Sequence, residues 1–343
     1  VVYDVNGNMV KTVSEVPLTE VLPKGFMAVR KGKRALNWRA DEPATLFYVE
    51  ALDEGDPKKE VKERDALYLW KAPFTGKATL LAKTTLRFSN MVWGNATTAI
   101  LHEEWYDTRM LRTSLINPSK TGGASKLVHE RNFQDIYSDP GGFETSKNQY
   151  GKYVLTIDKN NLFLIGDGHT PKGQFPFIDA LDMKTLKTKR LYQSAYTDKM
   201  EEIFDITDVK KGEVLVRIQS KNEYPNYYIR QLKKRIAPIK LTNFPNPFES
   251  IEKVYKEVIK YKRADGVELS GTLYLPAGYD RNAKTEKLPL LIWAYPAEYK
   301  DKNSAGQSSA NPNEFTFPYY GSFVYWVTRG YAVLDDAAFP IVG

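Results

Sequence analysis

The sequence predicts a mainly β protein in two parts, a partial β-propeller of about five blades followed by the beginning of an α/β domain. Short apolar runs separated by Gly, Pro, Asn and Asp fill residues 1–248. A pattern that starts at Trp38 returns at Trp93, and the pattern changes after residues 241–248. Because 343 residues exceed what one core usually fills, two structural units are expected.

The first part is typical of strands joined by turns. Its clearest strand-length runs are residues 45–50, 66–70, 98–103, 153–157, 162–165 and 213–218. After Trp38 and again after Trp93, a polar turn precedes an apolar strand. This spacing suits four-stranded propeller blades, which take roughly 45 to 50 residues each. An isolated β-sandwich is the alternative that the pattern leaves open.

The second part begins after residue 248, so the predicted domains are residues 1–248 and residues 249–343. Residues 267–275 alternate like a half-buried strand, and residues 288–295 form an apolar run typical of a strand buried on both faces. A polar loop over residues 296–318 then leads to a predicted helix over residues 319–329, which Gly330 closes. A strand at residues 331–334 completes the start of an α/β sheet.

Composition excludes several classes of protein. Hydrophobic residues make up 42% and charged residues 27%, as in ordinary globular domains. The longest apolar run, residues 288–297, is far shorter than the roughly 20 residues of a membrane-spanning helix. The first residues lack the pattern of a signal peptide. With Cys at 0, no disulfide or thiolate chemistry is expected, and the compartment stays open, with an extracytoplasmic location as the working expectation.

The formal net charge of +7 lies entirely in the first 250 residues, because residues 251–343 carry equal numbers of basic and acidic side chains. In residues 56–64 basic and acidic side chains are interspersed, as they are in solvated turns. No nucleic-acid partner is therefore expected.

Several segments resemble one family of peptidases. Residues 265–279 (DGVELSGTLYLPAGY) and 288–298 (LPLLIWAYPAE) resemble the entry to the peptidase domain of the prolyl oligopeptidase family. Further segments resemble its glutamyl endopeptidase branch, namely residues 30–34, 38–46, 104–109, 137–141, 305–307, 311–315 and 339–343. The resemblance spans nearly the whole chain.

This resemblance implies a β-propeller that caps an α/β-hydrolase domain, with an active site between them. It implies hydrolysis of peptides or unstructured polypeptides by a Ser-Asp-His acyl-enzyme mechanism, with cleavage after Glu as one option. Two alternatives stay open: a non-catalytic propeller that binds a peptide or a protein, and an acylaminoacyl- or esterase-type α/β-hydrolase. The sequence leaves the oligomeric state undetermined.

The catalytic triad is not visible in these residues. An α/β-hydrolase places its serine in a Gly-x-Ser-x-Gly turn, with Asp and His following in the chain. Residues 306–310 come nearest but lie in a loop, and Ser322 reads as a helix cap. His102, His129 and His169 all precede the hydrolase segment. We therefore expect Ser, Asp and His beyond Gly343, and we expect this chain alone to be inactive.

No metal or cofactor is expected. His102 is followed by two glutamates and a tryptophan, without the second histidine that a helical zinc site requires. Gly166 and Gly168 are better explained by a tight turn than by a nucleotide-binding loop, since no third glycine or helical pattern follows them.

Tyr295 is the one candidate catalytic residue. Acyl transfer requires hydrogen-bond donors for the oxyanion of the tetrahedral intermediate, and in hydrolase folds one donor lies just after the third strand. Tyr295 ends the apolar run at that place, where the resemblance implies an oxyanion-donating hydroxyl. The alternative is an interior tyrosine whose hydroxyl is bonded within the fold.

Overall fold

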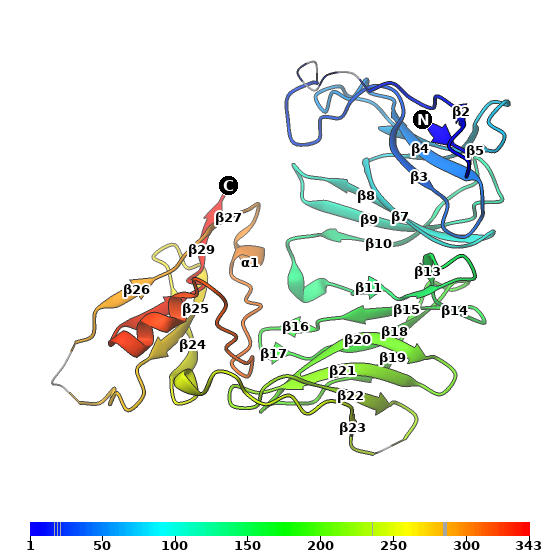
Figure 1. Ribbon diagram of the computed structural model, residues 1–343. Helices are drawn as coiled ribbons and strands as arrows, with labels where there is room; N and C mark the ends of the chain where they lie inside the picture. The colour runs from blue at the N-terminus through cyan, green and yellow to red at the C-terminus, as the bar shows by residue number, and fades with distance from the viewer. Residues whose placement is uncertain (17, 19, 21, 235, 284–286) are drawn as a thin grey trace. The chain divides into compact units, whose positions relative to one another are not determined.

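The computed structural model describes residues 1–16, 18, 20, 22–234, 236–283 and 287–343, and these residues are mainly strands (Figure 1). The predicted mainly β class is confirmed. The chain divides into two compact units, each made of three stretches. They are Val1–Phe133, Thr145–Leu162 and Asp182–Lys187 for the first unit, and Gln134–Glu144, Phe163–Leu181 and Thr188–Gly343 for the second. The boundary at residue 248 stays a prediction.

Two four-stranded antiparallel sheets form most of the first unit, and in each sheet every strand pairs with its neighbour in the chain. The first sheet contains β3 (Arg34–Trp38), β4 (Thr45–Ala51), β5 (Asp65–Lys71) and β6 (Thr79–Thr84). The second contains β7 (Arg87–Asn95), β8 (Thr98–Trp105), β9 (Met110–Ile116) and β10 (Lys126–Asn132). Trp38 and Trp93 lie on the first strands of these two sheets, so the repeat in the sequence marks successive sheets.

The two sheets share one apolar core. Phe47, Val49 and Leu67 of the first sheet pack with Trp93 and Leu101 of the second, and all five are buried. The rings of Phe47 and Trp93 meet edge to face, with centroids 5.5 Å apart. Alternation along the strands therefore directs the apolar side chains into this core.

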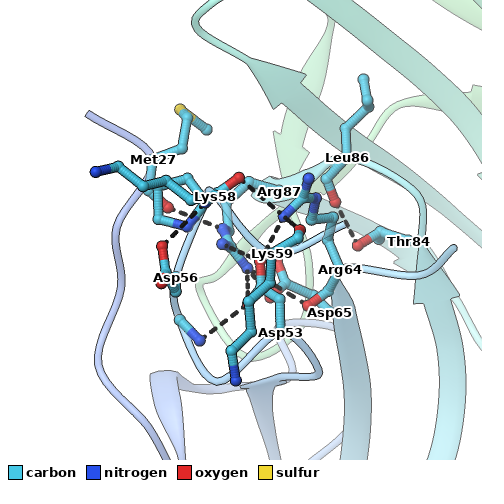
Figure 2. Close-up of polar contacts among 12 residues, drawn as sticks. Met27, Asp53, Asp56, Lys58, Lys59, Arg64, Asp65, Thr84, Leu86 and Arg87 are labelled. Atoms are coloured by element: carbon cyan, nitrogen blue, oxygen red, sulfur yellow. Dashed lines mark hydrogen bonds and ion pairs between the residues drawn. The ribbon is translucent and has the colours of Figure 1, made fainter. Parts of the chain in front are cut away.

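A buried ionic cluster also connects the two sheets, as Figure 2 shows. Arg87, the first residue of β7, binds Asp53 through Nη2 at 2.7 Å and Asp65 through Nη1 at 2.9 Å. Both carboxylates are fully buried. Arg64 adds a contact to Asp53 at 2.9 Å, and the backbone amide of Phe88 donates to Asp65 at 2.7 Å. The buried charges are thus paired and hydrogen-bonded, as burial of charge requires.

Two more antiparallel sheets follow in the chain. The third contains β11 (Gly142–Phe143), β15 (Asn161–Gly166), β18 (Phe177–Asp182) and β19 (Thr188–Gln193), with β14 (Ile157–Asp158) also pairing with β15. The fourth contains β20 (Met200–Asp208), β21 (Glu213–Gln219), β22 (Asn226–Gln231) and β23 (Ile239–Lys240). Phe163 and Ile178 pack against Val214 and Val216 to fill a second core.

The length of residues 1–248 predicts about five blades. The described residues of this range form the four sheets named above. Three two-stranded ribbons and their connections take up the remaining chain. The ribbons are β1 (Val2–Tyr3) with β2 (Met9–Lys11), β12 (Thr145–Lys147) with β13 (Tyr153–Leu155), and β16 (His169–Thr170) with β17 (Gly173–Gln174).

A mixed sheet follows residue 248. Its strand order is β24 (Tyr255–Lys262), β25 (Glu268–Leu275), β28 (Ala332–Asp335) and β26 (Leu290–Ile292). The first two junctions are antiparallel, whereas β26 and β28 are parallel. Beside it, β27 (Pro296–Tyr299) pairs in parallel with β29 (Phe339–Val342). The predicted sequence of hairpin, strand, helix and strand is present, but residues 296–318 also contain β27 and the short helix α1 (Lys302–Ala305).

The helix directly before β28 is a 3₁₀ helix, Phe323–Arg329, and it ends at Gly330 as predicted. Gly330 has a φ of 86°, which favours glycine because a Cβ is strained there. Val324 and Val327 are buried against Tyr274 and Val333 of the sheet. Ser322 occupies the N-cap position, but its side chain makes no capping hydrogen bond.

The apolar run at residues 288–295 differs from the prediction of a strand buried on both faces. Only Leu290–Ile292 is a strand, and Leu290 and Ile292 are 53% and 57% exposed. The reason is its place in the sheet: β26 pairs with β28 along one edge and is the last strand in the order. An apolar run cannot distinguish a central strand from an edge strand.

Candidate functional site

Tyr295 lies in the short connection from β26 to β27 and is 79% exposed. It lines a pocket of about 230 Å³, together with Ser270, Gln307, Ser308 and Asp336 among others. The role of Tyr295 stays a prediction. The side chain is open to solvent at this pocket.

Backbone hydrogen bonds position the connection that carries Tyr295. The amide of Trp293 donates to the carbonyl of Leu334 at 2.8 Å, and the carbonyl of Trp293 accepts from the amide of Ala337 at 2.9 Å. Downstream, Pro296 is already paired with Phe339 in the β27–β29 ladder. Tyr295 is therefore held between two hydrogen-bonded segments, which limits its range of positions.

A polar cluster, called the clamp below, joins residues 134–137 to residues 298–308. It consists of Gln134, Asp135, Tyr137, Gln307 and Ser308. Gln134 donates through Nε2 to the carbonyl of Glu298 at 2.5 Å and accepts from the amide of Lys300 at 3.2 Å. Gln307 donates to Asp135 at 2.7 Å and accepts from the amide of Tyr137 at 3.2 Å.

The clamp also reaches the wall of the Tyr295 pocket. The amide of Ser308 donates to the Tyr137 hydroxyl at 3.1 Å, and the hydroxyls of Ser270 and Ser308 lie 3.0 Å apart. Burial opposes ionisation of Asp135, yet hydrogen bonds from Gln307 and Ser138 lower the pKa of this carboxyl below its ordinary value. Asp135 is thus favoured in its ionised form, which accepts a hydrogen bond from Gln307. Sequence reasoning missed the clamp, because its two halves are more than 160 residues apart.

The other residues considered from sequence form no catalytic group with Tyr295. His102 lies on β8 with Nδ1 3.0 Å from the Thr113 hydroxyl, and burial lowers its pKa to about 4. His129 lies on β10, and His169 belongs to the β16–β17 ribbon. Gly306 ends helix α1, so residues 306–310 are a loop as predicted and not a strand-to-helix turn.

Residues 1–16, 18, 20, 22–234, 236–283 and 287–343 offer neither a metal site nor a membrane-spanning helix. They contain no group of three or more His, Asp or Glu side chains that could hold a metal ion. None of their helices is both long enough and apolar enough to cross a membrane.

Comparison with known proteins gives two relatives that match this chain along nearly its whole length. Proteins named probable glutamyl endopeptidase, chloroplastic, from Oryza sativa subsp. japonica and from Arabidopsis thaliana are each 37% identical to this chain. The matches cover 99% and 100% of this chain but only 38% and 37% of the two relatives. The chain therefore spans a little over a third of their length. No family model matches it.

Among solved structures, Porphyromonas gingivalis dipeptidyl peptidase 4 matches 88% of this chain and 49% of its own, with a TM-score of 0.49 and 14% identity. Oligopeptidase B from Leishmania major matches 88% of this chain and 44% of its own, with a TM-score of 0.47 and 8% identity. The similarity to the plant proteins along the whole chain confirms the predicted resemblance: this chain is similar to the glutamyl endopeptidase branch of the prolyl oligopeptidase family.

Proposed function

We propose that the protein to which this chain belongs is a serine peptidase that cleaves peptides or unstructured polypeptides. The observation that carries the proposal is the 37% identity, along the whole chain, to proteins named glutamyl endopeptidase. In this proposal the Ser, Asp and His of the triad lie beyond Gly343. Residues 1–248 form the propeller, and residues 249–343 begin the hydrolase domain that contains Tyr295.

The proposed chemistry is acyl transfer. A serine Oγ attacks the peptide carbonyl carbon while its proton passes to a histidine, and the carbonyl oxygen becomes an oxyanion. Tyr295 donates a hydrogen bond from its hydroxyl to that oxyanion. The tetrahedral intermediate then expels the amine, which takes the proton from histidine, and water hydrolyses the acyl-enzyme. Cleavage after Glu is the specificity suggested by the relatives' names.

The exposed position of Tyr295 supports this role, because a donor must reach the substrate carbonyl. Its hydrogen bond would strengthen only as the oxyanion forms, so it would lower the barrier with little effect on ground-state binding. In the whole protein, we expect Tyr295→Phe to lower kcat by about 10²–10³-fold with KM nearly unchanged. Steady-state hydrolysis of a peptide substrate measures both constants.

Tyr299→Phe is the matched control, since Tyr299 lines the same pocket from β27 and has no role in the proposed chemistry. We expect this variant to keep kcat within about threefold. If Tyr295→Phe also stayed within about threefold while its circular dichroism was native, Tyr295 would not be an oxyanion donor.

A further inference from the structure

A second pocket, of about 360 Å³, lies next to the Tyr295 pocket and is called the lysine pocket below. Its lining contains four lysines, Lys172, Lys221, Lys256 and Lys260, from two separate stretches of the second unit. The two pockets share Ser308 and Ala310 as lining residues, so they are direct neighbours. A peptide bound at Tyr295 could therefore extend into the lysine pocket.

The charge of the lysine pocket is unbalanced. Glu257 is the only acidic residue of its described lining, and this carboxylate is already bound by Arg281 at 2.7 Å and by the Tyr255 hydroxyl at 2.9 Å. Across the described ranges, none of the four lysines makes an ion pair with a carboxylate of the chain, although the charges of Glu314 and Asp335 favour the ammonium form of Lys256. The positive charge is thus available to an external anion.

Two of these lysines contact neutral groups. Lys256 donates to the carbonyl of Glu314 at 2.6 Å, and Lys260 lies 3.5 Å from the carbonyl of Pro171. Burial lowers the pKa of Lys256, so its ammonium is incompletely compensated by the fold. A carboxylate placed among these ammonium groups would gain charge-assisted hydrogen bonds.

We propose that the lysine pocket binds a carboxylate of the peptide whose scissile bond lies at Tyr295; this inference rests on the proposed function. The pocket volume is within the range of small-ligand sites. Ser308 and Asn313 line it as well and supply neutral polar groups. The carboxylate comes from an acidic side chain or from the C-terminus of the peptide, and the experiment below separates these two sources.

The test measures binding to the 343-residue chain, so it needs no catalysis. Fluorescence anisotropy at about 0.15 M ionic strength, where long-range attraction is screened, is recorded with three unstructured peptides of equal length. The first contains glutamates and has blocked termini, the second has glutamine at the same positions, and the third is the glutamine peptide with a free C-terminus. We expect the first or the third peptide to bind at least about tenfold more tightly than the second.

Variants that remove lysine charges show whether the carboxylate binds in the lysine pocket. Lys172→Gln/Lys221→Gln/Lys260→Gln should weaken binding of the carboxylate peptide by at least about tenfold. The control Lys62→Gln/Lys77→Gln/Lys120→Gln removes the same charge from three exposed lysines of the first unit and should change binding by less than about twofold.

Three results would each overturn the inference. They are equal binding of all three peptides, no binding of any of them, and equal losses in the two triple variants. None of these bears on the peptidase proposal, which the kinetics of Tyr295→Phe test separately.

Discussion

At the scale of single residues, the buried charges of Arg87, Asp53 and Asp65 are paired with one another. Arg87 is 2% exposed and Asp53 and Asp65 are fully buried, and each carboxylate has more than one partner. Sequence reasoning did not identify this cluster, because the three residues are spread over 34 positions and look like ordinary charged residues of turns and strand ends. Only the packing of β7 against the first sheet brings them together.

Asp53→Asn tests the ionic cluster. The substitution leaves the guanidinium of Arg87 buried with one carboxylate fewer, so the free energy of unfolding should fall by about 3–5 kcal/mol in urea denaturation. Glu54→Gln is the control, because Glu54 is the adjacent residue and makes exposed pairs with Lys31 and Lys59. An equal fall in the free energy of unfolding for the two variants would contradict a special role for the buried cluster.

Glu144 gives a prediction about pH. Burial, and then the hydrogen bond shared with Asp205, raise the pKa of Glu144 to about 8. At a pH between 4.5, the ordinary pKa of this carboxyl, and about 8, Glu144 is protonated in the folded chain and ionised in the unfolded chain. The stability contributed by this protonation is therefore fully present below pH 4.5 and is lost as pH rises toward 8.

Glu144→Gln should remove that pH dependence, because glutamine keeps a donor toward Asp205 and does not ionise. In urea denaturation at pH 5, 6.5 and 8, the variant should gain stability relative to the unmodified chain as the pH rises. A constant difference across these three pH values would show that Glu144 does not titrate in this range.

At the scale of elements, local signals predicted local structure well. The alternation at residues 267–275 and the glycine at position 330 were sufficient for β25 and for the end of the 3₁₀ helix. The exposure of β26 could not be predicted, since it depends on which strands lie beside it in the sheet. The clamp could not be predicted either, because its glutamines and tyrosine carry no local pattern.

Gln307→Ala tests whether the clamp holds the segment that borders the Tyr295 pocket. It removes the bonds to Asp135 and to the Tyr137 amide, so amide hydrogen exchange in residues 298–308 should become roughly five- to a hundredfold faster. Ser309→Ala, at the exposed neighbouring position, should leave these rates unchanged. Unaltered exchange in Gln307→Ala would mean that the ladder of β27 and β29 is sufficient to hold the segment.

At the scale of the whole molecule, the chain is rich in β structure and spans a little over a third of the length of its plant relatives. The sequence was sufficient to predict the mainly β class and the similarity to glutamyl endopeptidases, because the resemblance is spread along the whole chain. The role of Tyr295 stays a proposal, since its chemistry needs a serine, an aspartate and a histidine that the proposal places beyond Gly343.

Active-site labelling shows whether the nucleophilic serine lies outside residues 1–343. The whole protein and the 343-residue chain are each treated with a fluorophosphonate, and the modified residue is located by mass spectrometry. We expect stoichiometric labelling of one serine outside residues 1–343 in the whole protein, together with peptide hydrolysis, and neither labelling nor hydrolysis for the chain alone. Stoichiometric labelling of a serine within residues 1–343, or a whole protein that is neither labelled nor active, would contradict this expectation.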